Sequence, residues 1–404
     1  MRLFSGILVF LSTLACQNHS SGREPIFDHD NIPAVASKSD RPWPGERVLP
    51  EGTYYHFRDA GTFQDLLTIE HLVPLAFTAD PVMGEVTDLA FFDGHWFVLD
   101  KTTPAVFKYT GNGSWVTYFG RGGEGPGEFQ LPMLLRPAFD GLLSVGDPMQ
   151  GKIHLFRADG TYLRATDPDI GQRRIMARFG YIWDQPDRLY VAAFSSQNEG
   201  APQHVVLDYS SGEGSVLFGF GQRNKAVFQA RQRGSGTLPY GAFARIGQTI
   251  WTGSPFTTYL EIYDLDGRFL GNLGKEVPRH PESAVTQEDL EQLAREQKPE
   301  LKMRKLALKA ANHKIGRLGD VVVVQLGSFL DFYDRSGNLL KGNLPFLPLS
   351  NVFFTNDRLV MIFDPKVAIL ENRPEIANAL DGMEISEDVG WVLVVYKIRE
   401  ALFQ

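Results

Sequence analysis

The chain has 404 residues, of which 43% are hydrophobic and 22% are charged, and its formal net charge is −8. This composition excludes wholesale disorder, and the acidic balance argues against a nucleic-acid-binding protein, because such proteins carry basic surfaces. The single cysteine excludes an intrachain disulfide and any metal site built from several cysteines. Forty glycines, 24 prolines and 12% aromatic residues favour short strands joined by tight turns.

The first sixteen residues predict an export signal. A short apolar run, Leu3–Leu14, is too short to span a bilayer, which takes about 20 residues. The segment Thr13–Cys16 (TLAC) resembles the bacterial lipobox, although the motif usually has leucine in place of Thr13. The resemblance implies cleavage before Cys16, lipidation of that cysteine and, because Gln17 follows it, an outer-membrane location in the cell envelope. The alternative is an ordinary cleaved signal.

The next segment, residues 17–63, is polar and proline-bearing and shows no periodicity over most of its length. We therefore expect a flexible tether that holds the folded part away from the membrane. The folded part is expected to cover residues 64–404.

The body of the chain repeats a four-strand pattern about every 50 residues. In the clearest unit, Asp-Gly and Asn-Gly turns separate alternating apolar runs, which is a strong hairpin signal. Its predicted strands are Val86–Phe92, His95–Leu99, Ala105–Tyr109 and Ser114–Phe119. Three similar units follow: Leu134–Phe139 to Tyr162–Thr166, Arg178–Trp183 to Ser215–Phe220, and Gly241–Ile246 to Phe269–Leu273.

The last two units are incomplete. The fifth contains only Val321–Leu326, Phe329–Tyr333 and Leu339–Leu344, and the sixth contains Val352–Phe354, Leu359–Phe363 and Trp391–Ile398. Near the N-terminus, the strand Leu66–Leu75 has no unit of its own. Pairing Leu66–Leu75 with Trp391–Ile398 would close a ring and hide both edges. The pattern predicts an all-β, six-bladed β-propeller whose N- and C-terminal strands close the ring.

Particular motifs support this architecture. The segment Gly122–Phe129 (GGEGPGEF), followed by an Asp-Gly turn, resembles the NHL-type repeat, and the chain as a whole resembles the six-bladed β-propeller lipoproteins of bacteria. That family shares the glycine-rich joint and a C-terminal strand like Gly390–Lys397 (GWVLVVYK). The resemblance implies the fold and the compartment but no reaction, because propellers host many functions.

A helical insertion interrupts the pattern at about residues 283–313. Thr286–Asp289 (TQED) reads as a capping box, and Pro299 separates two short helices, of which the second is basic. The insertion is expected either to lie over one propeller face as a lid or to pack as a decoration. As a lid it would bring a set of candidate ligand-binding cations to that face: Lys302, Arg304, Lys305 and Lys309.

The glycine cluster Gly122–Gly127 is predicted to be a joint between blades. A phosphate-binding loop would need a helix after it, and here a strand follows. Its charged neighbours Arg121, Glu124 and Glu128 are further candidate ligand-binding residues at the mouth of the central channel.

Three aspartates, Asp100, Asp147 and Asp364, recur at the ends of second strands, so we expect them to cap backbone N–H groups rather than to catalyse. The histidines on or beside strands do not converge. We therefore predict no metal site and no cofactor, although Ca²⁺ or Zn²⁺ in the channel stays open.

Two functions remain. The first is a lipid-anchored binding or scaffolding module for a protein, peptide or small-molecule ligand, with the membrane reached only through the anchor. The alternative is a metal-dependent lyase or lactonase with its site in the central channel. No GxSxG or HExxH motif occurs, and this favours the non-enzymatic function.

Overall fold

Short alternating segments joined by glycine-containing turns build antiparallel hairpins in the computed structural model. At the two-residue turn Asp93-Gly94 both φ angles are positive, 48° and 71°, which suits the twist of the flanking strands. The structure describes residues 34–36, 53–55, 66–78, 80–168, 174–175, 180–194, 204–211, 214–221, 242–253, 259–275, four positions between 288 and 295, 313–326, 329–345, 352–355, 358–365, 374–381 and 389–399.

Six antiparallel four-stranded arrays are present, each ordered from an inner to an outer strand, within the unit Pro33–Gln404. Blade 1 contains β4 (Val86–Phe92), β5 (His95–Asp100), β6 (Ala105–Thr110) and β7 (Trp115–Phe119). Blade 2 contains β10 (Leu134–Pro137), β11 (Leu142–Asp147), β12 (Lys152–Arg157) and β13 (Tyr162–Thr166). Blade 3 contains β15 (Tyr181–Gln185), β16 (Arg188–Phe194), β17 (His204–Asp208) and β18 (Ser215–Phe220), with β14 (Arg174–Ile175) also paired to β16.

The remaining three blades follow the same order. Blade 4 contains β19 (Phe243–Ile246), β20 (Thr249–Gly253), β21 (Tyr259–Asp264) and β22 (Phe269–Lys275). Blade 5 contains β23 (His313–Leu318), β24 (Val321–Leu326), β25 (Phe329–Asp334) and β26 (Leu339–Pro345). Blade 6 contains β27 (Val352–Thr355), β28 (Arg358–Phe363), β29 (Val389–Ile398) and β3 (Leu67–Ala76). The predicted all-β, six-bladed propeller is confirmed.

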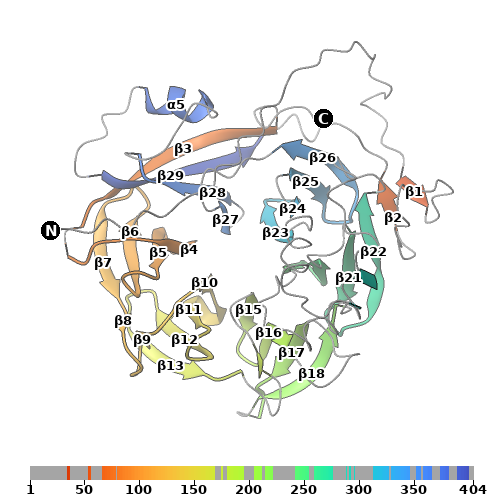
Figure 1. The fold of residues 1–404 in the computed structure, drawn as a ribbon, viewed down its shortest axis with the longest axis horizontal. Helices are drawn as coiled ribbons and strands as arrows, with labels where there is room; N and C mark the ends of the chain where they lie inside the picture. Colours follow the sequence, from red (N-terminus) through yellow and green to blue (C-terminus); the bar gives the residue numbers. More distant parts are fainter. Residues whose placement is uncertain are drawn as a thin grey trace. The chain divides into compact units, whose positions relative to one another are not determined.

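The inner strands meet around a common axis (Figure 1). Strand β4 contacts β10 and β27, β10 contacts β15, and β23 contacts both β19 and β27. Blades 3 and 4 are joined by an ion pair between Arg245 of β19 and Asp184 of β15. The apolar cores lie between neighbouring blades. For example, Phe97 of blade 1 and Val145 of blade 2 belong to one buried cluster.

The ends of the chain close the ring as predicted. Strand β3 pairs antiparallel with β29, with Leu67 opposite Ile398 and Leu75 opposite Trp391. Leu75 is completely buried, in the same apolar cluster as Leu393 of β29 and Trp96 of blade 1. Closure therefore joins the N-terminal strand to the core between blades 6 and 1.

Several elements differ from the sequence-based expectation. The inner strand of blade 5, β23, was absent from the predicted pattern, which placed its first residue, His313, at the end of the helical insertion. Helix α5 (Pro374–Leu380) lies between β28 and β29, where the pattern predicted no element, and its Ile376 is fully buried. Two short strands, β1 (Ala34–Ala36) and β2 (Thr53–Tyr55), lie inside the segment expected to be a tether, and β2 pairs in parallel with β22.

No helix among the described residues is long and apolar enough to cross a membrane.

Candidate functional site

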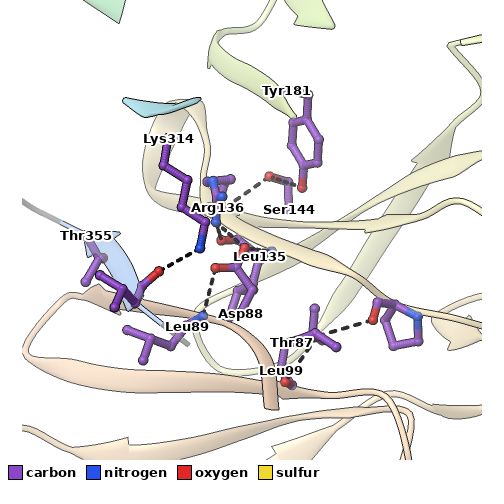
Figure 2. Close-up of polar contacts among 12 residues, drawn as sticks. Thr87, Asp88, Leu89, Leu99, Leu135, Arg136, Ser144, Tyr181, Lys314 and Thr355 are labelled. Atoms are coloured by element: carbon purple, nitrogen blue, oxygen red, sulfur yellow. Dashed lines mark hydrogen bonds and ion pairs between the residues drawn. The ribbon is translucent and has the colours of Figure 1, made fainter. Parts of the chain in front are cut away.

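A buried carboxylate lies where the inner strands of blades 1 and 2 meet. Asp88 is the third residue of β4, and only 3% of its surface is exposed. Its carboxylate accepts hydrogen bonds from the backbone N–H of Leu89 (3.0 Å) and of Leu135 on β10 (2.8 Å). It also forms an ion pair with the Arg136 guanidinium of β10. Asp88 therefore links two blades and fixes the position of Arg136 (Figure 2).

Arg136 is held from one side only. Its Nη1 donates to Asp88 Oδ2 and, at 2.7 Å, to the carbonyl oxygen of Leu135. Its side chain nevertheless remains 38% exposed. Arg136 thus combines a fixed guanidinium with access to solvent.

A second cation reaches the same place from blade 5. The Lys314 ammonium of β23 donates to the carbonyl oxygen of Val352 on β27 (3.0 Å) and lies 5.9 Å from the ring centroid of Phe353. Figure 2 shows this ammonium on the same side as Asp88 and Arg136. Lys314 is exposed by surface area, yet surrounding protein lowers its pKa. Its ammonium lies beside the inner strand β27 and near Asp88 and Arg136 (Figure 2).

Blades 2 and 3 contribute hydroxyl groups beside Arg136. The Tyr181 hydroxyl of β15 donates to Ser144 Oγ (3.0 Å), and the Ser144 hydroxyl donates to the carbonyl oxygen of Arg136 (3.0 Å). Burial raises the pKa of Tyr181 above its usual value, so this phenol stays protonated near neutral pH. We call Asp88, Arg136, Ser144, Tyr181 and Lys314 the axial cluster.

Burial and charge act in opposite directions within the axial cluster. The pKa of Asp88 is raised, because burial outweighs the lowering effects of Arg136 and of the two backbone N–H donors. Burial and the nearby Arg136 lower the pKa of Lys314, whereas Asp88 raises it. The ion pair with the Arg136 guanidinium and the two backbone N–H donors favour the ionised form of the Asp88 carboxylate. Two cations and one carboxylate then leave a formal charge of +1 facing solvent.

The predicted joint between blades 1 and 2 has a different character. Arg121 and Glu128 form an ion pair (Nη2 to Oε1, 2.6 Å), and Glu128 Oε2 accepts the Gly125 N–H at 2.9 Å. Glu124 Oε1 accepts a hydrogen bond from Gln130 Nε2 at 2.5 Å. The strands of this joint, β8 (Arg121–Gly122) and β9 (Glu128–Phe129), lie beside the outer strands β7 and β13 in Figure 1. The three candidate residues are thus engaged with one another and with the joint.

The glycines of this joint allow close packing. A Cβ on Gly120, where φ is +80°, would lie 2.2 Å from the ring of Phe129, and a Cβ on Gly123 would lie 2.0 Å from the Glu128 carboxylate. Phe129 is completely buried between blades 1 and 2. The geometry is that of a structural joint, as the sequence predicted.

Several candidates lie outside the described residues: Cys16, Lys302, Arg304, Lys305 and Lys309. Within the predicted insertion, Glu288, Glu291, Gln292 and Arg295 are helical and exposed. Gln292 donates to Glu288 (2.9 Å), and Arg295 lies 3.6 Å from Glu291.

The recurring aspartates cap backbone groups, as predicted. Asp100 accepts the N–H groups of Gly84 (2.6 Å) and Thr103 (2.7 Å). Asp147 accepts the N–H groups of Gln130, Leu131, Met149 and Gln150, at 2.6 to 3.1 Å. Both carboxylates are completely buried. Asp364 directly follows β28, as expected for the third member of the set.

The histidines do not form a common site in the described part of the chain. His95 lies on the second strand of its blade, while His154 and His204 lie on third strands. His71, on the outer strand β3, is 3.8 Å from Glu70. Among the described residues, no group of three or more His, Cys, Asp or Glu side chains is arranged to hold a metal ion.

Sequence reasoning did not identify the axial cluster. A weak signal existed, because Asp88 is a charged residue in the mostly apolar strand Val86–Phe92, and Lys314 and Arg317 are charged residues within β23. Such charges can be assigned to a common site at the propeller axis only once the order of the blades and their inner strands is known.

Comparisons with known proteins agree with this fold. Residues 54–231 match the sequence model of a family described as a 6-bladed beta-propeller, DUF5128. No curated protein matches the sequence.

Solved structures of bacterial propellers resemble the chain at low identity. A Bacteroides fragilis protein predicted to be exported has a TM-score of 0.59 at 13% identity, covering 85% of this chain and 98% of its own. A DUF4221 member from Bacteroides vulgatus has a TM-score of 0.52 at 10% identity, covering 82% and 98%. Virginiamycin B lyase from Staphylococcus aureus reaches only 0.41 at 9% identity, covering 69% and 78%, and this likeness supports no inference about activity. The chain is therefore a six-bladed β-propeller, similar over residues 54–231 to that propeller family.

Proposed function

We propose that this protein is an exported, lipid-anchored binding module whose ligand is held at the propeller axis by the axial cluster. The observation that carries the proposal is the meeting of Asp88, Arg136 and Lys314 from three blades (Figure 2), in which the side chains of both cations remain accessible to solvent. In propellers, polar groups from several inner strands can meet at the axis, where one ligand contacts them all.

The positions of the charges fit binding better than a purely structural role. Asp88 alone would satisfy the backbone donors between blades 1 and 2, and Arg136 would balance its charge. Lys314 adds a second cation that this arrangement does not need. Placing two cations together costs free energy unless an anion shares them, so the extra charge points to a ligand.

Export and anchoring rest on the Thr13–Cys16 motif and agree with the description of the Bacteroides fragilis relative as exported. We propose that Cys16 carries the lipid, so that the propeller is tethered to the outer membrane of the cell envelope through acyl chains alone. Each methylene buried in the bilayer contributes about 0.8 kcal/mol, which makes more than one chain a firm anchor.

Replacing Cys16 with serine tests the anchor. The Cys16→Ser protein is expected to leave the membrane fraction or to retain its signal segment, measured by fractionation and by intact mass. Ser5→Ala, which changes a residue inside the signal, is the control and should leave processing unchanged. Unaltered membrane partition of Cys16→Ser would contradict the lipid anchor.

Ligand binding at the axis is tested by thermal unfolding of the purified protein with a panel of small acids, amines and neutral sugars. A ligand that binds only the folded state raises the melting temperature. We expect stabilisation by part of the panel in the unsubstituted protein, and its loss in Lys314→Met. Stabilisation by no compound, or by compounds whose effect survives Lys314→Met, would contradict an axial binding site.

A further inference from the structure

We infer that the axial cluster binds one carboxylate group of a small organic acid between Arg136 and Lys314. This inference rests on the proposed function and names the ligand class of the same site. It follows from three properties of the cluster: the donors left unused, the rigid placement of both cations, and the amount of charge to be neutralised.

The Arg136 guanidinium has hydrogen-bond donors that the described part of the chain does not use. A guanidinium carries five N–H donors, and the contacts of Arg136 within the described residues, to Asp88 and to the Leu135 carbonyl, both use Nη1. Its Nε and Nη2 groups therefore have no acceptor in the described part of the chain, although 38% of the side chain is accessible. A planar carboxylate accepts two parallel hydrogen bonds from such a guanidinium edge.

The Lys314 ammonium is also held in place by the protein and also has hydrogen-bond donors that the described part of the chain does not use. Its ammonium carries three donors, and one of them is used by the Val352 carbonyl at 3.0 Å. The Phe353 ring beneath it restricts the side chain further. Both cations are thus oriented before a ligand arrives, and this preorganisation reduces the entropy lost on binding.

The charge of the cluster favours a single negative charge on the ligand. The Asp88 carboxylate is committed to Arg136 and to two backbone N–H groups, so it cannot neutralise both cations. One carboxylate balances the remaining +1. A phosphate monoester carries about −1.5 to −2 near neutral pH and would leave an excess of negative charge beside buried Asp88.

The electrostatics of Lys314 are consistent with this ligand. Burial lowers the pKa of Lys314 most, Asp88 opposes this effect, and Arg136 lowers the pKa further because the two positive charges repel each other. An anion between the two cations would offset this repulsion, so binding the anion would recover the free energy that the repulsion costs the unliganded cluster.

Lys108 of β6 provides a matched control within the same chain. Its ammonium also donates to a backbone carbonyl, that of Ala158 (2.9 Å), and lies 5.5 Å from the centroid of a phenylalanine ring, Phe97. Lys108 belongs to a third strand rather than to an inner one. Lys108→Met therefore removes the same kinds of contact as Lys314→Met without touching the axial cluster.

The experiment uses acetate and D-glucuronate as carboxylate probes, with D-glucose and inorganic phosphate as neutral and more highly charged comparisons. Binding is measured by saturation-transfer NMR and by titration calorimetry at constant ionic strength. We expect both carboxylates to bind the unsubstituted protein with a Kd of about 1 mM or above. Lys314→Met should weaken their binding about tenfold, since a charge-assisted hydrogen bond is lost. Lys108→Met should bind as the unsubstituted protein does.

Arg136→Lys is the second variant, because it keeps the charge beside Asp88 and removes the planar fork. It is expected to weaken carboxylate binding about tenfold as well, which keeps the test decisive if Lys314→Met does not fold. Absence of carboxylate binding in the unsubstituted protein, or carboxylate binding in Arg136→Lys and Lys314→Met that is as tight as in the unsubstituted protein, would overturn the inference.

The other probes separate this inference from the proposed function. If phosphate or glucose binds in place of the carboxylates and depends on Lys314, the axial site exists but its ligand class is wrong. If none of the compounds in either panel binds in a Lys314-dependent way, both the inference and the axial site of the proposed function fail.

Discussion

The joint between blades 1 and 2 and the axial cluster both contain an arginine–carboxylate ion pair, but they differ in origin and in setting. Arg121 and Glu128 are seven residues apart and form their pair at the outer side of the ring, where 79% of the Arg121 side chain is exposed. Arg136 and Asp88 are 48 residues apart, and Asp88 is buried between inner strands.

The two regions also differ in completeness. In the joint, Glu128 accepts donors from Arg121 and Gly125, and the formal charges of the Arg121–Glu128 pair cancel. In the axial cluster, Lys314 adds a positive charge that Asp88 does not balance. The comparison teaches that the conspicuous glycine-rich motif serves the architecture, whereas the group with unused binding capacity is assembled from single residues of several blades. Four experiments test how strongly this protein depends on contacts assembled from distant segments.

The largest effect is expected from removing the strand that closes the ring. Deleting residues 1–76 eliminates β3, exposes the edge of β29 and opens the apolar cluster shared by blades 6 and 1. We expect the cooperative thermal transition to be lost. Deleting only residues 1–63 keeps β3 and is expected to preserve the transition. The single change Leu75→Ala should cost about 3 kcal/mol, because it removes part of one buried side chain.

An undiminished cooperative melt after deletion of residues 1–76 would show that the ring does not depend on β3.

The next effect concerns the buried ion pair. Asp88→Asn removes the charge that balances Arg136 and places an amide among backbone donors, so we expect a loss of about 3 kcal/mol in the free energy of unfolding. Urea unfolding measures this loss. Asp264→Asn, at an exposed turn where the carboxylate pairs with Arg268, is the matched control and should change stability much less. Equal effects of the two substitutions would mean that burial of Asp88 contributes nothing.

The third effect is a pH dependence that originates between blades 1 and 2. His154 is 1% exposed and packs against Phe129, Phe156 and Tyr162. Neither of its ring nitrogens has a hydrogen-bond partner among the described residues. Burial lowers its pKa from 6.5 to about 4, against the opposing effect of Asp147, and Lys152 lowers it further.

The imidazole of His154 binds a proton more tightly in the unfolded chain than in the folded chain. The contribution of neutral His154 to the free energy of unfolding is therefore complete above about pH 6.5 and is lost as the pH falls towards 4. The loss amounts to at most about 3 kcal/mol. His154→Leu should therefore flatten the dependence of stability on pH between 4 and 6.5, measured by urea unfolding at several pH values. His95→Leu, a change at a partly exposed histidine, should leave that dependence unchanged. Identical pH profiles for the unsubstituted protein and His154→Leu would refute the assignment.

The smallest effect is expected at the joint. Glu128→Gln removes the charge of an exposed ion pair, while its amide oxygen can still accept the Gly125 N–H. The hydrogen bonds from Gly125 and Arg121 lower the pKa of Glu128. The small stabilisation from the ionised Glu128 carboxylate should therefore be present at pH values above the ordinary pKa of glutamate and should be lost in acid. The midpoint of urea unfolding at neutral pH should move far less than in Asp88→Asn. A comparable shift in both variants would erase the distinction between the two regions.

Local features of the sequence determined the propeller, its blade strands other than β23, and its closure. Asp-Gly turns need only their own backbone preference to reverse the chain, so Asp93-Gly94 marked its hairpin without knowledge of the rest of the fold. The N-terminal strand had no blade of its own and the last blade lacked one strand, so the sequence predicted that the first would complete the second. In the structure β3 pairs with β29. The aspartate caps were predictable for the same reason, because Asp100 and Asp147 repeat at equivalent strand ends.

Tertiary structure alone decided β23 and the axial cluster. Strand β23 lacks an apolar pattern because Lys314 extends towards Asp88 and Arg136 of other blades (Figure 2). In addition, Gly316 leaves room for the Phe354 ring of β27, which lies where a Cβ would be. Asp88, Arg136 and Lys314 carry no common motif, since each belongs to a different blade and only the closed ring brings the three together. A charge on an inner strand acquires its partner through blade order, which is a long-range property that no local window of sequence contains.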